Sequence, residues 1–319
     1  MPSITLFDQT TRATAQILPE AGFNCHSLKI PCFGKSVEIL DTEPEFGTPA
    51  SSPTRSGIPL LFPFPNRIRE GRFHCQNRDW QLRHSRVDPN GNSIHGYVMN
   101  RAWRVTKQTA DTLIGEFHLG RDYPEVREDW PADFLIEACY HLADSVLRCD
   151  LRIVNTDRVP LPWGFGTHTY FRIPLAPGGC TGDVLIQAPV SDLWELADSL
   201  PTGRRLAIPP EVDLREGLTL AGLKLDHVFG GLKSRGGRTE TTVMDPAAGL
   251  QVTQSFGPEF RELVVFTPPH GRSVCLEPYT CVTDAINLEA RGIDAGWREL
   301  PPGGQARLWF EITAGPVLA

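Results

Sequence analysis

Apolar and polar residues alternate with a period of two over much of this chain. The clearest case is residues 134–142, where one face of the predicted strand carries Phe134, Ile136, Ala138, Tyr140 and Leu142. Residues 146–154 repeat the pattern, and Ala143-Asp144-Ser145 between the two runs is typical of a turn. Because successive side chains of a strand point to opposite faces, the pattern predicts an antiparallel hairpin over 134–154 with one buried face.

The same alternation recurs elsewhere, whereas helical periodicity is scarce. Further strands are predicted over Thr112–Leu119, Asp183–Val190 and Gln305–Thr313. Residues 191–199 favour a short helix, with Ser191 or Asp192 as its N-cap. The 29 glycines and 28 prolines are spread along the chain, as many turns require. We therefore predict an all-β fold, a large antiparallel β-sandwich with very few short helices, and assign residues 1–319 to one domain.

The charge balance narrows the possible partners. The 38 acidic residues outnumber 31 Lys and Arg, which gives a net charge of −7 at pH 7 and a pI of about 5.7. A nucleic-acid-binding groove needs an excess of basic residues, so this balance argues against such a partner. Residues 1–5 lack the basic and apolar regions of a secretory signal, and no apolar run approaches membrane-spanning length. We expect a cytoplasmic protein without membrane contacts.

The cysteine spacing argues against a structural zinc site. The eight cysteines lie at positions 25, 32, 75, 139, 149, 180, 275 and 281, and none forms a C-x-x-C pair. In a reducing compartment they are expected to be free thiols, mostly packed in strands. The sequence also offers no cluster of ligands with metal spacing, so no metal is predicted.

A stiff apolar tract precedes the first candidate functional residues. In residues 57–68, three prolines alternate with large apolar side chains, and the tract ends near Asn66 and Arg67. Proline cannot donate to a sheet ladder, so we do not expect a central strand here. A rigid loop presents a side chain accurately, and the side chain that this loop would present is Arg67.

Further segments place chemically active residues at turns or strand ends. His95 lies beside Gly96, and His168 lies among glycines and aromatic residues, whose faces can support a sugar ring. Glu277 ends an apolar strand before a proline, where a carboxylate is costly unless it is paired or used. Asp226 interrupts an apolar stretch. Taken singly, each also fits a structural role: a hydrogen-bonded or buried histidine, an ion-paired glutamate or a turn aspartate.

Taken in order, these segments resemble the aldose 1-epimerase (galactose mutarotase) family. The resemblance rests on Pro65-Asn66-Arg67, Ile94-His95-Gly96, Gly166-Thr167-His168-Thr169-Tyr170-Phe171, Leu225-Asp226 and Leu276-Glu277-Pro278. It covers about residues 10 to 313 and includes the opening strands over 15–40 and the closing strand near Trp309. It implies a large antiparallel β-sandwich, in agreement with the alternation described above.

The resemblance also implies a role for each site residue. His168 would be the general acid that protonates the ring oxygen, and Glu277 would be the base that takes the proton from the anomeric hydroxyl. Arg67, with Asn66 beside it, and also His95 and Asp226 would hold ring hydroxyls. The implied activity is that of an isomerase that interconverts the α- and β-anomers of a free aldose such as glucose or galactose.

The chemistry itself is consistent with these residue types. Opening a cyclic hemiacetal needs one proton removed and one delivered, so no cofactor or metal is required. Because a carboxylate-rich site would stabilise an imidazolium, we expect a raised pKa for His168 and an alkaline limb of activity above neutrality.

Two departures from the family pattern leave the sugar open. Residues 163–166 replace the usual polar residues by Trp-Gly-Phe-Gly, and Arg172-Ile173 stand where many relatives carry Asn-Leu. A second hypothesis is therefore a mutarotase for an anionic sugar such as a hexose 6-phosphate, using Arg69, Arg72 or Arg172. A third is a non-catalytic carbohydrate-binding protein on the same scaffold. Loss of the acid or the base would favour the third, and both are present. A monomer and a homodimer both remain open.

Overall fold

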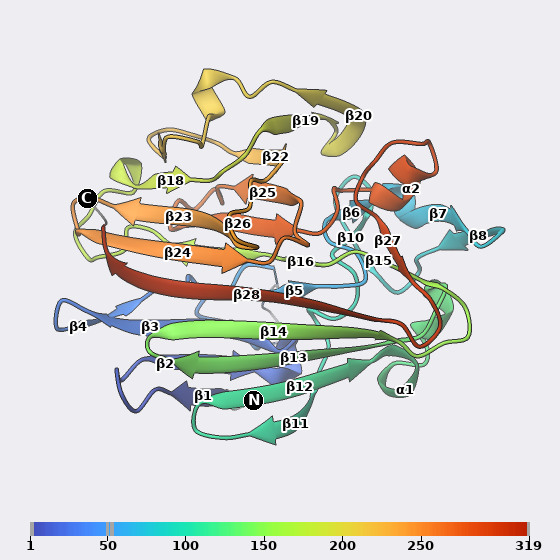
Figure 1. Ribbon diagram of the computed structural model, residues 1–319, viewed down its shortest axis with the longest axis horizontal. Helices are drawn as coiled ribbons and strands as arrows, with labels where there is room; N and C mark the ends of the chain where they lie inside the picture. The colour runs from blue at the N-terminus through green and yellow to red at the C-terminus, as the bar shows by residue number, and fades with distance from the viewer. Residues whose placement is uncertain (1–2, 49–50, 52–53, 318–319) are drawn as a thin grey trace.

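The computed structural model describes residues 3–48, 51 and 54–317, and antiparallel strands dominate it (Figure 1). One large sheet has nine strands. In order across the sheet these are β11 (Arg104–Gln108), β12 (Thr112–His118), β13 (Phe134–Ala143), β14 (Val146–Asn155), β28 (Gln305–Pro316), β24 (Leu250–Phe256), β23 (Thr239–Asp245), β18 (Leu185–Gln187) and β21 (Leu218–Thr219).

A second large sheet has eight strands and lies behind the first in Figure 1. Its order is β20 (Leu200–Leu206), β19 (Asp192–Ala197), β22 (Asp226–Gly230), β25 (Glu262–Phe266), β26 (Ser273–Tyr279), β16 (Gly166–Thr167) and β5 (Leu60–Leu61), with β17 (Thr169–Arg172) also paired to β26. The paired strands of both large sheets are antiparallel, which confirms the predicted fold class.

Smaller sheets and short helices complete the described chain. A four-stranded sheet joins β1 (Ile4–Phe7), β2 (Thr14–Leu18), β3 (Asn24–Cys32) and β4 (Lys35–Glu38). The others join β6 (Arg67–Ile68), β10 (Ser93–Ile94) and β9 (Arg86–Val87); β15 (Leu161–Trp163) and β27 (Arg298–Leu300); and β7 (Arg72–Cys75) and β8 (Arg78–Gln81). The α-helices of the described residues are α1 (Leu119–Asp122) and α2 (Ala285–Glu289), and 3₁₀ turns cover 19–21, 69–71, 127–129, 181–183 and 210–212.

The hairpin over 134–154 forms as predicted. β13 and β14 pair from Phe134 opposite Asn155 to Ala143 opposite Val146. Asp144 and Ser145 take left-handed backbone conformations with φ of 51° and 61°, the geometry of a two-residue hairpin turn. The predicted inward face is fully buried along β13, so the alternation identified both the element and its core face.

The prediction of a short helix over 191–199 was wrong. The segment contains β19, which pairs with β20 on one side and β22 on the other. Asp198 and Ser199 have φ of 51° and 64° and form a hairpin turn of the same kind. An isolated helix of this length is only marginally stable in water. As a strand, by contrast, the segment forms hydrogen bonds to a neighbouring strand on each side.

The proline-rich tract over 57–68 is not a central strand, as predicted. Within it, β5 has two residues and lies at the end of the eight-stranded sheet, and β6 belongs to the small three-stranded sheet. All eight cysteines, each within the described chain, are free thiols. Among the described residues no helix is both long and apolar enough to cross a membrane.

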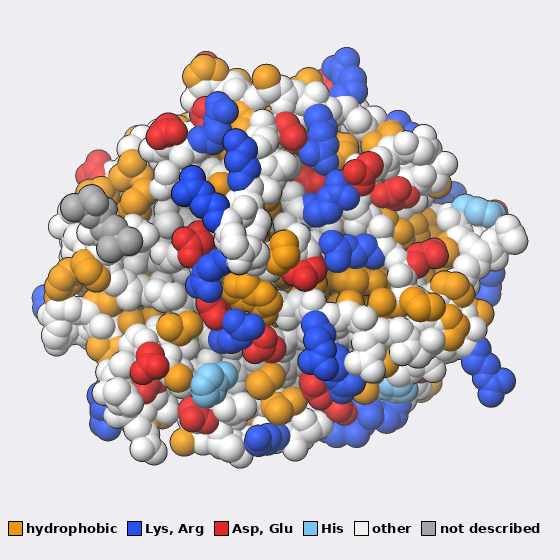
Figure 2. Space-filling view, in the orientation of Figure 1, with side chains coloured by type: hydrophobic (Ala, Val, Ile, Leu, Met, Phe, Trp, Pro, Cys, Tyr) orange, Lys and Arg blue, Asp and Glu red, His pale blue; other side chains and the backbone are white. Residues whose placement is uncertain are grey.

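The outer face of the nine-stranded sheet is turned to the viewer in Figures 1 and 2, and it mixes charges of both signs. Arg148 of β14 contacts Asp150 at 2.7 Å and Glu311 of β28 at 2.6 Å. Arg238 contacts the same glutamate at 2.7 Å. Basic side chains on this face therefore stand beside carboxylates, which is consistent with the net negative charge.

Candidate active site

The strand register gathers site residues on one face of the eight-stranded sheet. Asp226 of β22 lies opposite Phe266 of β25, Phe266 opposite Cys275 of β26, and Cys275 opposite Tyr170 of β17. These four residues therefore form a row across four strands. Two residues further along β26, Glu277 points to the same face. The opposite face carries apolar residues of the main core, namely Leu263, Val265, Val274 and Leu276.

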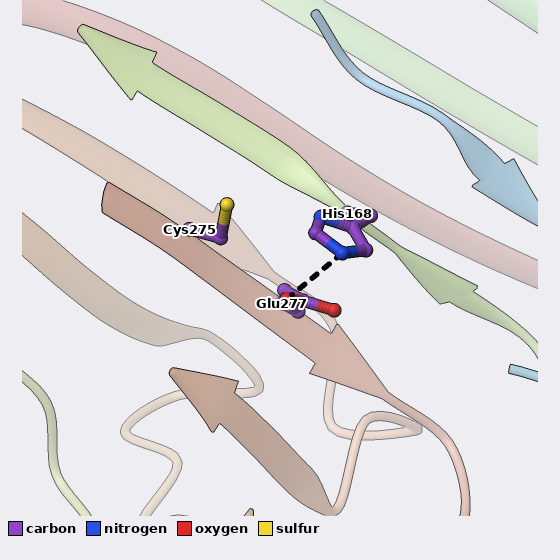
Figure 3. Close-up of side chains that lie close together, drawn as sticks. All are labelled: His168, Cys275 and Glu277. Carbon is purple, nitrogen blue, oxygen red and sulfur yellow. Dashed lines mark ion pairs between the residues drawn. The ribbon is translucent and has the colours of Figure 1, made fainter. Parts of the chain in front are cut away.

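His168 lies in the short break between β16 and β17. Gly166 is opposite Tyr279 and Thr169 is opposite Leu276, so the register places His168 across from Glu277. Figure 3 shows the imidazole over the strand that carries Glu277, with Nε2 of His168 3.3 Å from Oε1 of the carboxyl group. The two residues are only 7% and 1% exposed. The sheet thus brings together, in a buried position, the two residues predicted to exchange protons.

Two tyrosines fix the orientation of this pair. The hydroxyl of Tyr279 donates a hydrogen bond of 2.5 Å to Oε2 of Glu277. The ring of Tyr170 stacks on the imidazole of His168, with centroids 4.7 Å apart and planes 6° from parallel. Both side chains are buried, so the pair is held by packing as well as by hydrogen bonding.

The small three-stranded sheet carries Arg67 in β6, and His95 directly follows its strand β10. His95 is buried, and its ring centroid is 5.4 Å from that of His168. Nδ1 of His95 accepts a hydrogen bond of 3.2 Å from the backbone N–H of Asn66, so Nε2 carries the ring hydrogen and can donate. The next residue, Gly96, lies against the backbone of Phe62, where an added Cβ would be 2.1 Å from the carbonyl oxygen of Phe62. Only a glycine fits at this position.

Arg67 is held in place by two acceptors. Its Nε donates to Asp88 at 2.7 Å, and one Nη donates to the side-chain oxygen of Asn66 at 3.0 Å. The side-chain oxygen of Asn66 therefore holds the guanidinium of Arg67 in position. Asp226, by contrast, is exposed and lies at the end of its row, beyond Phe266.

Burial decides the charge state of the central pair. Desolvation lowers the pKa of His168 to about 3 and raises the pKa of Glu277 well above its ordinary value, although the Tyr279 hydrogen bond opposes the second shift. The pair thus holds one proton, in the form of a neutral imidazole and a carboxylic acid. The raised pKa expected for His168 from sequence was wrong in direction, because a sequence does not reveal how completely the imidazole is removed from water.

A family model described as aldose 1-epimerase matches residues 24–313, which is most of the chain. The chain belongs to the aldose 1-epimerase family. It is 24% identical over 255 residues to the uncharacterized protein YihR of Escherichia coli, covering 79% of this chain and 77% of that one. It is 27% identical over 173 residues to the uncharacterized protein YphB of the same organism, covering 54% of each.

Solved structures agree with this family assignment at the level of the fold. A galactose mutarotase-like protein from Clostridium acetobutylicum superposes with a TM-score of 0.85 at 24% identity, covering 96% of this chain and 93% of that one. A GalM/aldose epimerase homologue from C. elegans gives a TM-score of 0.81 at 16% identity, with 99% of both chains covered. The fold of this member of the aldose 1-epimerase family is therefore galactose mutarotase-like.

The site also contains a set of donors that sequence spacing did not reveal. Ligand atoms of His168, Cys275 and Glu277 all lie within 4.8 Å of one another (Figure 3). Sulfur, imidazole and carboxylate are donor types that zinc prefers. Burial raises the pKa of the Cys275 thiol well above its ordinary value, which disfavours the thiolate that a zinc ion needs. His168 is more than a hundred positions away from Cys275 and Glu277 in the sequence, so no local motif contains all three residues.

Sequence reasoning missed several other residues in this family member's site. Tyr170, Cys275 and Tyr279 each lie two positions from His168 or Glu277 on a strand, so the period of two could have found them. The arginines suggested for an anionic sugar do not contact the pair: Arg69 lies 3.9 Å from Asp284, and Arg72 contacts Glu70. Arg172 is exposed at the far end of β17, with no ion pair to a described residue.

Proposed function

We propose that the chain is a cofactor-independent mutarotase that interconverts the α- and β-anomers of a free aldose. The observation that carries the proposal is the contact between His168 and Glu277, 3.3 Å apart and buried on the site face of the sheet. Mutarotation needs a proton acceptor for the anomeric hydroxyl and a proton donor for the ring oxygen. A pair that shares one proton meets both needs and recovers its starting state after each turnover.

The proposed reaction begins with movement of the shared proton from Glu277 to His168. His168 then protonates the ring oxygen while Glu277 takes the proton of the anomeric hydroxyl, and the bond between C1 and the ring oxygen breaks. The open-chain aldehyde rotates about C1–C2. On closure each residue reverses its role, so no proton is gained or lost.

Burial favours the ring-opening step. Once the ring has opened, Glu277 is a carboxylic acid and His168 a neutral imidazole, the form that desolvation stabilises. The imidazolium–carboxylate form that precedes opening is disfavoured in the same surroundings. Because the resting pair has the same neutral form, burial makes the first proton movement costly and returns that cost in the ring-opening step.

The remaining predicted site residues are assigned to positioning. Arg67 and the Nε2 hydrogen of His95 donate to ring hydroxyls, and Asn66 keeps the guanidinium of Arg67 in place. Asp226 accepts from a hydroxyl at the open end of the site. Together they fix the ring so that C1 and the ring oxygen meet the pair.

A polarimetric screen of freshly dissolved α-anomers tests the proposal. The wild-type protein should accelerate the approach of at least one aldose to its anomeric equilibrium beyond the spontaneous rate. The rate should persist after thorough chelation of divalent ions, because proton transfer needs no Lewis acid. If no aldose, neutral or charged, is accelerated over the spontaneous reaction, the chain is not a mutarotase.

A further inference from the structure

A second arginine, Arg86, lies across β10 from Arg67 in the small three-stranded sheet. Ile94 of β10 is directly opposite Arg67 of β6 on one side and Arg86 of β9 on the other. Directly opposed residues of neighbouring strands point to the same face of a sheet, so both arginines share the face that carries Ile94. His95, the next residue, belongs to the site described above.

The two arginines differ in their partners. Arg67 is neutralised by Asp88, whose carboxylate lies 2.7 Å from its Nε. Arg86 is partly buried, yet no carboxylate among the described residues lies within ion-pair distance of it. Its hydrogen bond is to the neutral hydroxyl of Thr54, at 3.3 Å. A partly buried guanidinium without a counter-charge is costly in an unoccupied protein and is well suited to bind an anion.

Contacts through Thr54 place Arg86 on the His168 side of the site. The hydroxyl of Tyr170, the residue stacked on His168, donates to the backbone carbonyl of Thr54. The side chain of the same threonine accepts from Arg86. Asp226 lies on the other side, beyond Phe266 in the row across the sheet.

The electrostatic surroundings of Arg86 agree with this placement. Desolvation lowers the pKa of Arg86, the Tyr170 hydroxyl opposes that shift, and the neighbouring Arg55 adds to it. Desolvation lowers the pKa of the buried His95, and Arg86 adds to that shift together with His168 and Arg67. The nearby carboxylates are engaged elsewhere, since Asp88 contacts Arg67 and Glu43 lies 3.7 Å from Arg55. An arginine retains its charge under such shifts, so excess positive charge remains here.

We propose that Arg86 binds an anionic group on C6 of the sugar, and this inference rests on the mutarotase function proposed above. If His168 acts on the ring oxygen, the adjacent C5 and its C6 substituent lie on the His168 side, where Arg86 is found. The shared chemistry is an oxyanion, either the carboxylate of a uronic acid or the phosphate of a hexose 6-phosphate. The arginine that selects an anionic substrate is thus Arg86, rather than Arg69, Arg72 or Arg172.

The test compares anomerisation of α-glucose, α-galactose, glucuronic acid, galacturonic acid and glucose 6-phosphate. The wild-type protein should show a kcat/KM at least about tenfold higher for one anionic class than for the neutral hexoses, as expected for one charge-assisted contact. Arg86→Gln should lower that preference by about tenfold, mainly through KM, and Arg86→Lys should recover part of it. Arg72→Gln, an exposed arginine paired with Glu70, should leave the preference unchanged.

Each alternative outcome has a separate meaning. Equal losses of kcat/KM on neutral and anionic sugars in Arg86→Gln would show that Arg86 only supports Thr54, and the inference would be wrong. A wild-type preference for neutral hexoses would overturn it while leaving the mutarotase function intact. If no sugar is turned over, calorimetry with glucuronate and glucose 6-phosphate decides. Binding that weakens tenfold in Arg86→Gln supports the anion site, and absent or unchanged binding refutes it.

Discussion

Strands β13 and β26 bury their side chains in different ways. β13 alternates between fully buried and partly exposed residues, and its polar side chains, such as Glu137, lie on the exposed side. β26 is buried along its whole length, so Glu277 and Tyr279 are removed from water on the face opposite to the core. A charged residue on β13 is solvated at little cost, whereas the same residue on β26 needs a partner or a function. The comparison singles out β26 as the strand that carries Glu277, the base of the proposed reaction.

The largest expected difference between the two strands is in turnover. Glu277→Gln and His168→Gln should each lower kcat by about 10²–10⁴-fold, the usual contribution of a positioned proton-transfer group. Glu137→Gln is the matched control, because Glu137 pairs with Arg152 at 3.3 Å on the outer face of the hairpin. It should leave kcat unchanged. Steady-state polarimetry measures all three, and near-normal turnover in Glu277→Gln would remove that residue from the mechanism.

A smaller loss is expected from the positioning residues. Arg67→Ala should lower kcat/KM by about 10- to 100-fold, the cost of one or two charged hydrogen bonds, and both kcat and KM should change because a misaligned ring reacts slowly. Arg152→Ala removes an arginine from the hairpin instead and should affect neither constant. If Arg67→Ala behaved like Arg152→Ala, Arg67 would have only a structural role beside Asp88.

The two strands also mark how far sequence reasoning reached. The β13–β14 hairpin was predictable because one face of its strands contacts water and the other face packs in the core. Apolar and polar residues therefore alternate along the sequence with a period of two. The local sequence of β19 favours a helix because its pairing partners β20 and β22 lie outside any short stretch of sequence. Tertiary contacts decided that segment.

The candidate site shows the same division. His168, Glu277, Arg67 and His95 are predicted as site residues through a family resemblance, and the structure gathers them from separate strands and loops. Arg86 was missed because its surroundings come from residues 54, 95 and 170, which no motif connects. The direction of the His168 pKa shift was missed because burial on all sides is a property of the folded sheet.

A further contrast is expected in stability. In the folded state the pKa of Glu277 is raised above the ordinary 4.5. The carboxyl group therefore contributes its full stability to the folded state only below about pH 4.5, where the unfolded chain also keeps the proton. As the pH rises, the unfolded chain gains by ionising and the folded state becomes relatively less stable. Glu277→Gln should therefore raise the free energy of unfolding at pH 8 by about 1 kcal/mol or more, the equivalent of one pKa unit.

Denaturant unfolding at pH 8 and pH 4 measures this effect. The gain from Glu277→Gln should shrink at pH 4, where the unfolded chain is itself largely protonated. Glu137→Gln should change stability by less than about 0.5 kcal/mol at either pH, as is usual for a surface substitution. A Glu277→Gln variant that is less stable than wild type at pH 8 would mean that the carboxyl group is stabilised as an anion.

The pH dependence of anomerisation tests the central claim, that a buried pair holding one proton performs the reaction. A second proton is added only near the lowered His168 pKa of about 3, and the only proton is lost at the raised pKa of Glu277. The acid limb of the rate, corrected for the spontaneous reaction, should therefore lie near pH 3 and not near pH 6.5, the ordinary imidazole value. Glu277→Gln should remove the alkaline limb of whatever rate remains. A limb centred near pH 6.5 that persists in Glu277→Gln would show that His168 titrates as a solvated imidazole and would contradict the account.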